Sequence, residues 1–376
     1  MGFWDRLIVR QKVTASGPPS ITQVARSTGG DQPATWTSRP DLWPADADVG
    51  LRVINYVFKR MQIDEDWSVR EARGFTWWGH TLAQRVWAET PRLDDDMTIT
   101  KLHVETGFVK NVDAHSATEA VVSAINTHAT LSAAIWDPVR RRVSFHCTMF
   151  VHEENVDWVE ELFTHAVALQ TADAHSLASG IADPLNGEVD ETNHPTSGPR
   201  PQADEMLGAM NNYFFTQAPS PYGGQDLVTT LRLLEQRFLA NGDEEELVAE
   251  FPCTEDKPAI MRAALGLRGV GTALFRAYTT PRHPRLGSGA LLLLELPIGG
   301  DVALANRLNE AERDEWTSSH LLGGWCVGPA GNESSALMFA SFLPAKVRTP
   351  SVLINCALNM GLRAKWAGEF LARSSS

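Results

Sequence analysis

The residues best suited to chemistry gather in the first half of the chain. Nine of the eleven histidines precede residue 200, and the stretch AIWDPVRRRVSFHCTMFVHEENVDW, residues 134–158, contains His146, Cys147 and His152. Histidine and cysteine side chains bind zinc and other transition metals, and a cysteine paired with a histidine can act as a nucleophile. The first question is therefore whether this cluster forms a metal site or a nucleophilic site.

A metal site would combine His103 with His146 or His152. Along a strand His146 and His152 face the same side, but six residues at roughly 3.3 Å each place them about 20 Å apart. They cannot share one ion, and the sequence indicates no third ligand for His103 and His146. We therefore predict no metal site, and His103 and His146 are the only candidates for one. We expect both histidines to lie on a solvent-facing side of the sheet.

A nucleophilic Cys147 is also disfavoured. Neighbours on a strand point to opposite faces, so His146 cannot readily activate Cys147. Cys147 shares its face with Val143, Phe145 and Met149, which is typical of a core position. The four cysteines form no CxxC pair, so reduced, buried thiols in a reducing compartment are expected. We predict no catalytic residue and no cofactor.

The elements that position these residues recur in the same order in each half. The first half predicts a helix over 49–61, strands near 67–71, 75–88 and 99–109, a helix over 116–128, the hairpin of the opening stretch, and a helix from Asn155. The second half predicts a helix over 226–239, strands over 247–251, 260–267, 272–279 and 290–297, a helix opening with Asp301 as its cap, a hairpin, and a helix capped by Thr349.

This order predicts an α+β fold built by tandem duplication of one unit, in which each copy is an antiparallel sheet backed by helices. In the two hairpins Trp136 is matched with Trp325, and SFHCTMFV with ALMFASFL. The boundaries predicted are 1–48 for a loose lead-in with a short amphipathic start, 49–173 for the first repeat, 174–224 for a linker with a short amphipathic helix, and 225–376 for the second repeat. Such a duplication yields a pseudo-dimer within one chain, and a further homodimer is left open.

The succession helix, three strands, helix, two strands, helix resembles the type III secretion chaperone-like fold, which includes the bacterial YbjN-like sensory-transduction-regulator family. The resemblance covers roughly residues 49–173 and 225–370. It rests on element order, size and acidic charge, without a signature motif. It implies a small, acidic, cytoplasmic, non-enzymatic protein that binds protein segments, and it carries no catalytic residues.

Surface composition limits the partners. The net charge is −13, which disfavours nucleic acid and anionic membranes because both would repel the chain. The longest apolar run, ALLLLEL at 290–296, is far too short to cross a bilayer. We expect a cytoplasmic protein with a protein partner.

The residues predicted to contact that partner come from two places. The second hairpin strand is apolar on both sides, so both sides are expected to be covered, by the protein itself or by a partner segment. The amphipathic piece ADEMLGAMNNYFF is expected to dock on its own domain or to occupy a groove that a partner would otherwise fill. The predicted contacts are Met338, Phe342, Trp325, Met206, Met210 and Phe214.

These observations predict a non-enzymatic cytoplasmic protein-interaction or chaperone-like module that binds a protein segment through an apolar groove. The alternative is a small-molecule-binding or metal-binding enzyme with a site in the cleft between the two repeats. A cluster of three convergent histidine or carboxylate side chains around an ion would favour the alternative.

Overall fold

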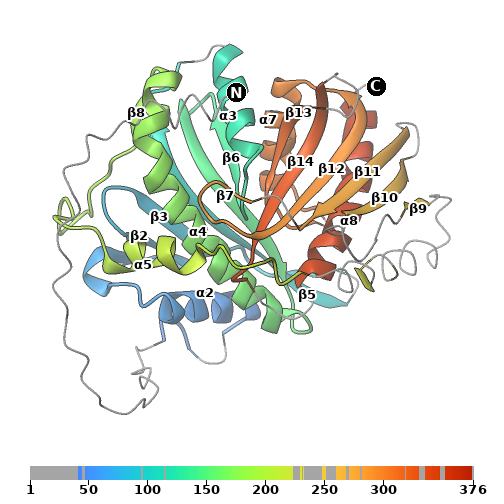
Figure 1. Cartoon of the computed structure of the whole chain (residues 1–376). Helices are drawn as coiled ribbons and strands as arrows, with labels where there is room; N and C mark the ends of the chain where they lie inside the picture. Colours follow the sequence, from blue (N-terminus) through green and yellow to red (C-terminus); the bar gives the residue numbers. More distant parts are fainter. Residues whose placement is uncertain are drawn as a thin grey trace. The chain divides into compact units, whose positions relative to one another are not determined.

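Two antiparallel sheets carry the α+β fold, as predicted (Figure 1). The computed structural model describes residues 41–374 apart from 45–46, 95, 114–115, 223–228, 231, 233–247, 251–259, 268–270, 280–281, 318, 330–334 and 348–351. The predicted amphipathic start, most of the predicted helix 226–239 and the predicted cap Thr349 lie outside these residues. Contacts group Asp41–Ser376 into one unit that contains both sheets.

The first sheet has the strand order β1-β2-β3-β5-β7-β6, and β4 and β8 pair with β5. Its strands are β1 (Ser68–Arg70), β2 (Gly74–Trp78), β3 (Ala83–Ala88), β4 (Arg92–Asp94), β5 (Met97–Lys110), β6 (Ala133–Asp137), β7 (Arg142–Val151) and β8 (Glu188–Val189). The associated helices are α2 (Val49–Arg60), α3 (Ser116–Asn126), α4 (Val156–Ala182) and α5 (Glu205–Phe214), with short 3-10 turns at Glu65–Trp67 and Asp183–Leu185.

The second sheet has the order β13-β14-β12-β11-β10-β9. Its strands are β9 (Val248–Glu250), β10 (Ile260–Leu267), β11 (Gly271–Tyr278), β12 (Gly289–Gly299), β13 (Gly324–Pro329) and β14 (Ser335–Pro344), accompanied by α7 (Val302–Asp314) and α8 (Val352–Ser374). Counted from the hairpin outward, the first sheet runs β6-β7-β5-β3-β2-β1 and the second runs β13-β14-β12-β11-β10-β9. The strands therefore follow the same order along the chain in both sheets once β4 and β8 are left out.

Local sequence explains several of these elements. The side chain of Asp48 accepts hydrogen bonds from the Gly50 and Leu51 amides and so starts α2, whose apolar stripe is buried. Asp301 caps α7 in the same way, as predicted, through the Ala303 and Leu304 amides.

Two predicted boundaries differ from the structure. The predicted strand over 75–88 is two strands, β2 and β3, because the chain turns between Trp78 and Ala83. The predicted linker from residue 174 begins inside α4, which continues to Ala182. Ala174, Ala178 and Ile181 pack in a core cluster with Trp136, so burial holds this Ser- and Gly-containing stretch helical.

The two sheets meet at their edge strands β6 and β13, beside α3 and α7 (Figure 1). On α7, the Asn309 amide group bonds the N–H and the C=O of Trp325 in its own sheet, at 2.7 and 3.0 Å. The Asn306 amide group bonds the N–H and the C=O of Trp136 in the other sheet, both at 3.0 Å. Unpaired backbone groups of both edge strands are thereby satisfied.

Helix α3 makes the corresponding contacts. The Asn126 amide group bonds the N–H and the C=O of Ala134 in its own sheet, at 2.7 and 2.8 Å. Three residues earlier, the Ser123 hydroxyl accepts from the Val327 amide of the other sheet at 2.8 Å. Judged by these contacts, the residue of the first hairpin that corresponds to Trp325 is Ala134, whereas the sequence comparison matches Trp136 with Trp325. Duplication itself stays a prediction, which the matched contacts favour.

Replacing Ser123 with alanine tests one of these hydrogen bonds between the two sheets. The substitution leaves the Val327 amide without its acceptor, and we expect the free energy of unfolding to fall by about 1–2 kcal/mol. Denaturant titration measures the change. Ser176→Ala is the control, because that exposed hydroxyl bonds only within its own helix, and it should cost less than about 0.5 kcal/mol.

Candidate functional site

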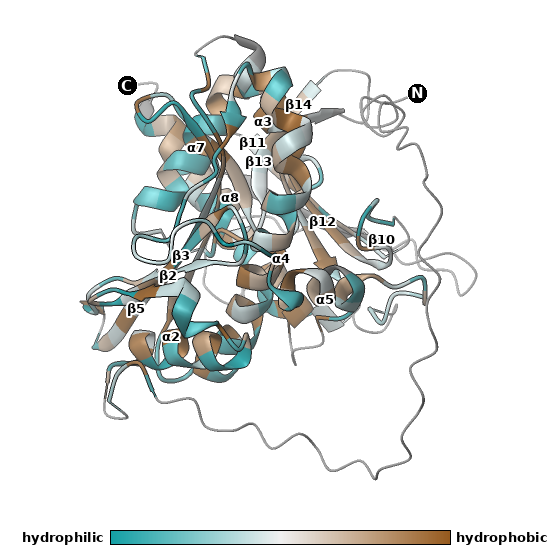
Figure 2. Cartoon of the chain, turned by 90° about the vertical axis from the view of Figure 1, so that its left-hand side faces the viewer, coloured by the Kyte–Doolittle hydropathy of each residue, from teal (hydrophilic) through white to brown (hydrophobic). Residues whose placement is uncertain are grey.

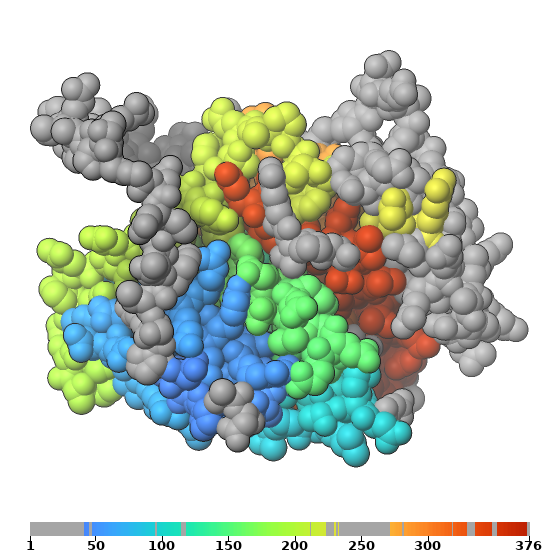
Figure 3. Space-filling model, turned by 90° about the horizontal axis from the view of Figure 1, so that it is seen from below, coloured from blue at the N-terminus to red at the C-terminus, as the bar shows by residue number. Residues whose placement is uncertain are grey.

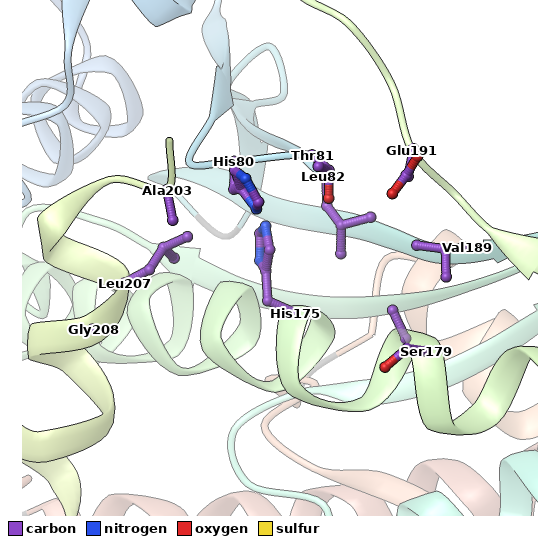
Figure 4. A pocket seen from close by; sticks show the side chains of 11 residues that line it. His80, Thr81, Leu82, His175, Ser179, Val189, Glu191, Ala203, Leu207 and Gly208 are labelled. Atoms are coloured by element: carbon purple, nitrogen blue, oxygen red, sulfur yellow. The ribbon is translucent and has the colours of Figure 1, made fainter. Parts of the chain in front are cut away.

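A cavity of about 340 Å³ opens between the β2–β3 turn, α4 and the first turn of α5 (Figure 4). We call it the His80–His175 pocket. Its lining consists of His80, Thr81, Leu82, His175, Ala178, Ser179, Val189, Glu191, Ala203, Leu207 and Gly208. Most of these residues come from the segment predicted as a linker, and the remainder come from the turn that the sequence pattern did not reveal.

The segment that follows α4 is fixed against the β2–β3 turn. The Trp78 indole N–H donates to the Thr192 hydroxyl at 3.1 Å, and the Asp204 amide donates to the Gly79 carbonyl at 2.8 Å. Arg200 donates to the Trp78 carbonyl at 2.7 Å and to the Asp204 carboxylate at 3.1 Å. Three of these four bonds join residues more than 100 positions apart, and together they hold the wall of the pocket in place.

His175 carries the most distinctive chemistry of the pocket. Its Nδ1 lies 2.8 Å from the Thr171 carbonyl, and since a carbonyl only accepts, Nδ1 must hold the proton. Its Nε2 therefore presents a lone pair, and that atom is buried without a hydrogen-bond partner. Burial lowers the pKa of His175 and favours the neutral ring. The His80 ring faces it with a centroid separation of 6.3 Å (Figure 4).

Helix α5 docks on α4 as an amphipathic helix (Figure 2). Leu207, Met210 and Phe214 are buried in the main core cluster, and Met206 packs against it partly buried. The Phe214 ring lies edge-on to His165 of α4 at 5.7 Å. Tyr213 and Phe215 are about half exposed. We call the contact made by Leu207, Met210 and Phe214 the α5 interface.

The α5 interface lies beside the place where the chain passes from the first half to the second. After α5 the chain pairs with the second half through a bridge between Thr216 and Gly287, and the Tyr222 hydroxyl donates to the Pro344 carbonyl at 3.2 Å. In Figure 3 the yellow-green surface that includes α5 adjoins the green surface of α4 and the red surface of the second half.

The predicted contacts in the second hairpin are buried. Trp325, Met338 and Phe342 have exposed fractions of 0%, 6% and 2%. The Phe342 amide donates to the Ala129 carbonyl of the first half at 2.8 Å. Both sides of β14 are therefore covered, as predicted, by the chain itself. Partner binding through these three residues stays a prediction and needs the two halves to separate.

His103 and His146 lie close together but are not exposed, so the expectation of a solvent-facing side was wrong. They sit diagonally on β5 and β7 and are 7% and 4% exposed, because the end of α7 covers this face. His103 bonds the Glu89 carboxylate at 2.9 Å, and the Ser144 hydroxyl lies 2.8 Å from His146. Burial lowers the pKa of both imidazoles.

The polar side of this sheet is used to hold α7. Lys101 is fully buried and donates to the carbonyls of Arg313 and Glu315 at the end of α7, each at 2.6 Å. A cation at a helix C-terminus is favoured by the helix dipole. Burial lowers the pKa of Lys101 to about 8.

Metal and thiol chemistry find little support in the part of the chain that the structure describes. Among those residues no group of three His, Cys, Asp or Glu side chains is placed to hold a metal ion. Cys147, Cys326 and Cys356 are free and buried, and burial raises the pKa of each thiol, to about 12 for the last two. Since the thiolate is the reactive form, burial disfavours a nucleophilic role for these cysteines.

Sequence reasoning missed both histidines of the pocket. His80 follows Gly79 inside a run that alternates like one strand, and His175 lies in a Ser-, Ala- and Gly-containing stretch that resembles a linker. The available signal was the spacing of Thr171 and His175, since a histidine four residues after a helical carbonyl can donate Nδ1–H to it.

Within the described residues no helix is both long enough and apolar enough to cross a membrane. No family model, curated protein or solved structure matches the chain. The resemblance to type III secretion chaperone-like and YbjN-like domains therefore stays a prediction.

Proposed function

We propose that this protein is a non-enzymatic interaction module that binds an amphipathic helical segment of a partner protein at the α5 interface. The observation that carries the proposal is α5 itself, which occupies an apolar site on α4 with three side chains at helical spacing, Leu207, Met210 and Phe214. A partner helix with the same spacing of apolar residues can replace it.

Helix α5 is suited to be replaced. It has only ten residues and contains Gly208 and two asparagines, so it is too short and too weak in helix propensity to form without docking. Elements with this character open locally at a lower free energy than the surrounding core. The site that it leaves is apolar, as the predicted groove requires.

The wider prediction fits this proposal. The acidic net charge favours protein partners over nucleic acid or anionic membranes. The free, buried thiols fit a reducing, cytoplasmic setting. The His80–His175 pocket does not itself support the alternative, an enzyme with a cleft between the repeats, because it lies between elements of residues 74–208.

Binding of a synthetic peptide with the sequence of residues 204–215 tests the proposal. Gly208→Pro should break α5 without altering the site on α4, since a proline inside a helix costs about 3 kcal/mol. Loss of the internal competitor should raise the apparent affinity for the labelled peptide about 100-fold over the unsubstituted protein. Fluorescence anisotropy with the full chain measures it.

Gly208→Ala is the matched control. A Cβ at Gly208 meets no atom within 4 Å, and alanine favours the helix by about 1 kcal/mol, so peptide binding should weaken about fivefold. A peptide with Glu at the positions of Met210 and Phe214 should not bind. The proposal fails if the Gly208→Pro protein unfolds cooperatively but does not bind the peptide. Met210→Glu provides a second undocked variant if Gly208→Pro does not fold.

A further inference from the structure

The His80–His175 pocket offers hydrogen-bond acceptors to a ligand. The His175 Nε2 lone pair is fixed as an acceptor because Nδ1 donates to the Thr171 carbonyl. The Glu191 carboxylate, at the opposite wall, also accepts only (Figure 4). Lys and Arg do not occur among the lining side chains. A ligand that bonds to both of these acceptors must therefore bring donors.

The unpartnered Nε2 of His175 needs an explanation. A buried polar atom without a hydrogen bond carries a desolvation penalty, and such atoms usually have a water or a ligand as their partner. The facing His80 ring does not supply one, and it stands on a turn where its side chain is only half-buried. A donor group that enters beside His80 would satisfy His175.

The rest of the pocket suits a compact hydrocarbon. Leu82, Ala178, Val189 and Leu207 provide an apolar wall, and a volume of about 340 Å³ is at the small end of the range for small-molecule sites. The net charge of −13 and the carboxylate of Glu191 attract a cation and repel an anion.

We propose that the His80–His175 pocket binds a small primary amine, whose ammonium group donates to His175 Nε2 and whose carbon body packs on the apolar wall. An ammonium group has three donors and no acceptor, which suits His175 Nε2 and Glu191, and the Thr81 and Ser179 hydroxyls can also accept from it. Glu191 contributes by charge at the rim. Leu207 and Gly208 of α5 line this pocket, so the amine site is complete only while α5 is docked, and its test uses the chain without any added peptide.

Three compounds of similar shape test the proposal by calorimetric titration into the full chain at pH 7.5. The amine is 2-phenylethylamine, the neutral analogue is 2-phenylethanol, and the anion is phenylacetate. We expect the amine to bind at least tenfold more tightly than either of the others, because a hydrogen bond from a charged donor is worth about that factor. Equal binding of the amine and the acid, or no binding of the amine, overturns the proposal.

His175→Phe keeps a ring of similar size and removes the acceptor, so it should weaken amine binding at least about tenfold. Glu191→Gln should weaken it a few-fold, whereas Glu188→Gln, an exposed residue outside the lining that loses the same charge, should not. Unchanged binding by His175→Phe overturns the assignment. If that variant does not fold, the ¹⁵N resonance of His175 Nε2 is followed in the unsubstituted protein. We expect it to shift when the amine is added, and an unchanged resonance overturns the assignment.

Discussion

Replacing Glu312 with glutamine lowers the free energy of unfolding by about 3–5 kcal/mol, because it leaves the Arg363 charge buried without its counter-ion. The two side chains are 0% and 2% exposed, and Arg363 Nε donates to both Glu312 oxygens at 2.8 and 3.1 Å. The same carboxylate accepts from the Trp325 indole N–H at 3.0 Å and the Ser319 hydroxyl at 2.9 Å. Denaturant titration at neutral pH measures the loss.

A double-mutant cycle separates the pair from its surroundings. Arg363→Met should be destabilising by a similar amount, whereas Glu312→Met combined with Arg363→Met should cost much less than the sum. Glu369→Gln on the exposed side of α8 should change stability by less than about 0.5 kcal/mol. Single substitutions at Glu312 and Arg363 that each cost under about 1 kcal/mol would contradict this account.

Acidification from pH 7 to pH 5 destabilises the protein by about 4 kcal/mol through two buried histidines alone, His320 and His283. Burial lowers the pKa of His320 to about 3 and that of His283 to about 4, from 6.5 in the unfolded chain. The unfolded state therefore binds protons first as the pH falls below 6.5. Each histidine then removes about 2 kcal/mol by pH 5, and the loss continues until the folded pKa is reached.

The geometry explains why these rings must stay neutral. His320 Nδ1 accepts from the Phe150 amide of the first half at 3.0 Å, and Arg363 and His152 add to the cost of a positive charge there. His283 Nδ1 accepts from the Leu286 amide at 3.2 Å. His320→Asn should reduce the difference in unfolding free energy between pH 7 and pH 5 by about 2 kcal/mol. An unchanged pH dependence in this variant would rule out His320 as a source.

The sequence predicted elements that depend on local pattern. The apolar stripe over 49–61, the Asp301 cap and the hairpin at 134–151 are local signals, and the structure confirms each. Asn155 does precede α4, but its amide group bonds the His152 amide and the Phe150 carbonyl rather than the first turn of the helix.

Features that depend on distant residues could not be predicted in the same way. Alternation along β7 cannot reveal that α7, more than 150 residues later, covers the side with His146. The His80–His175 pocket requires a turn, a helix end and a connecting segment to meet, and none of the three has a distinctive pattern. Strand parity placed Cys147 in the core correctly, because that inference needs only one strand.

The contact between Asn306 and Trp136 also has a consequence during synthesis. The two residues are 170 positions apart, so the edge of β6 leaves the ribosome long before its amide partner exists. At about 5–20 residues per second the delay is roughly 10–30 s. During that interval the nascent first half exposes a strand edge of the kind that pairs with other chains. Ribosome-associated factors, or crowding among neighbouring nascent copies, would therefore act on this protein mainly before its second half emerges.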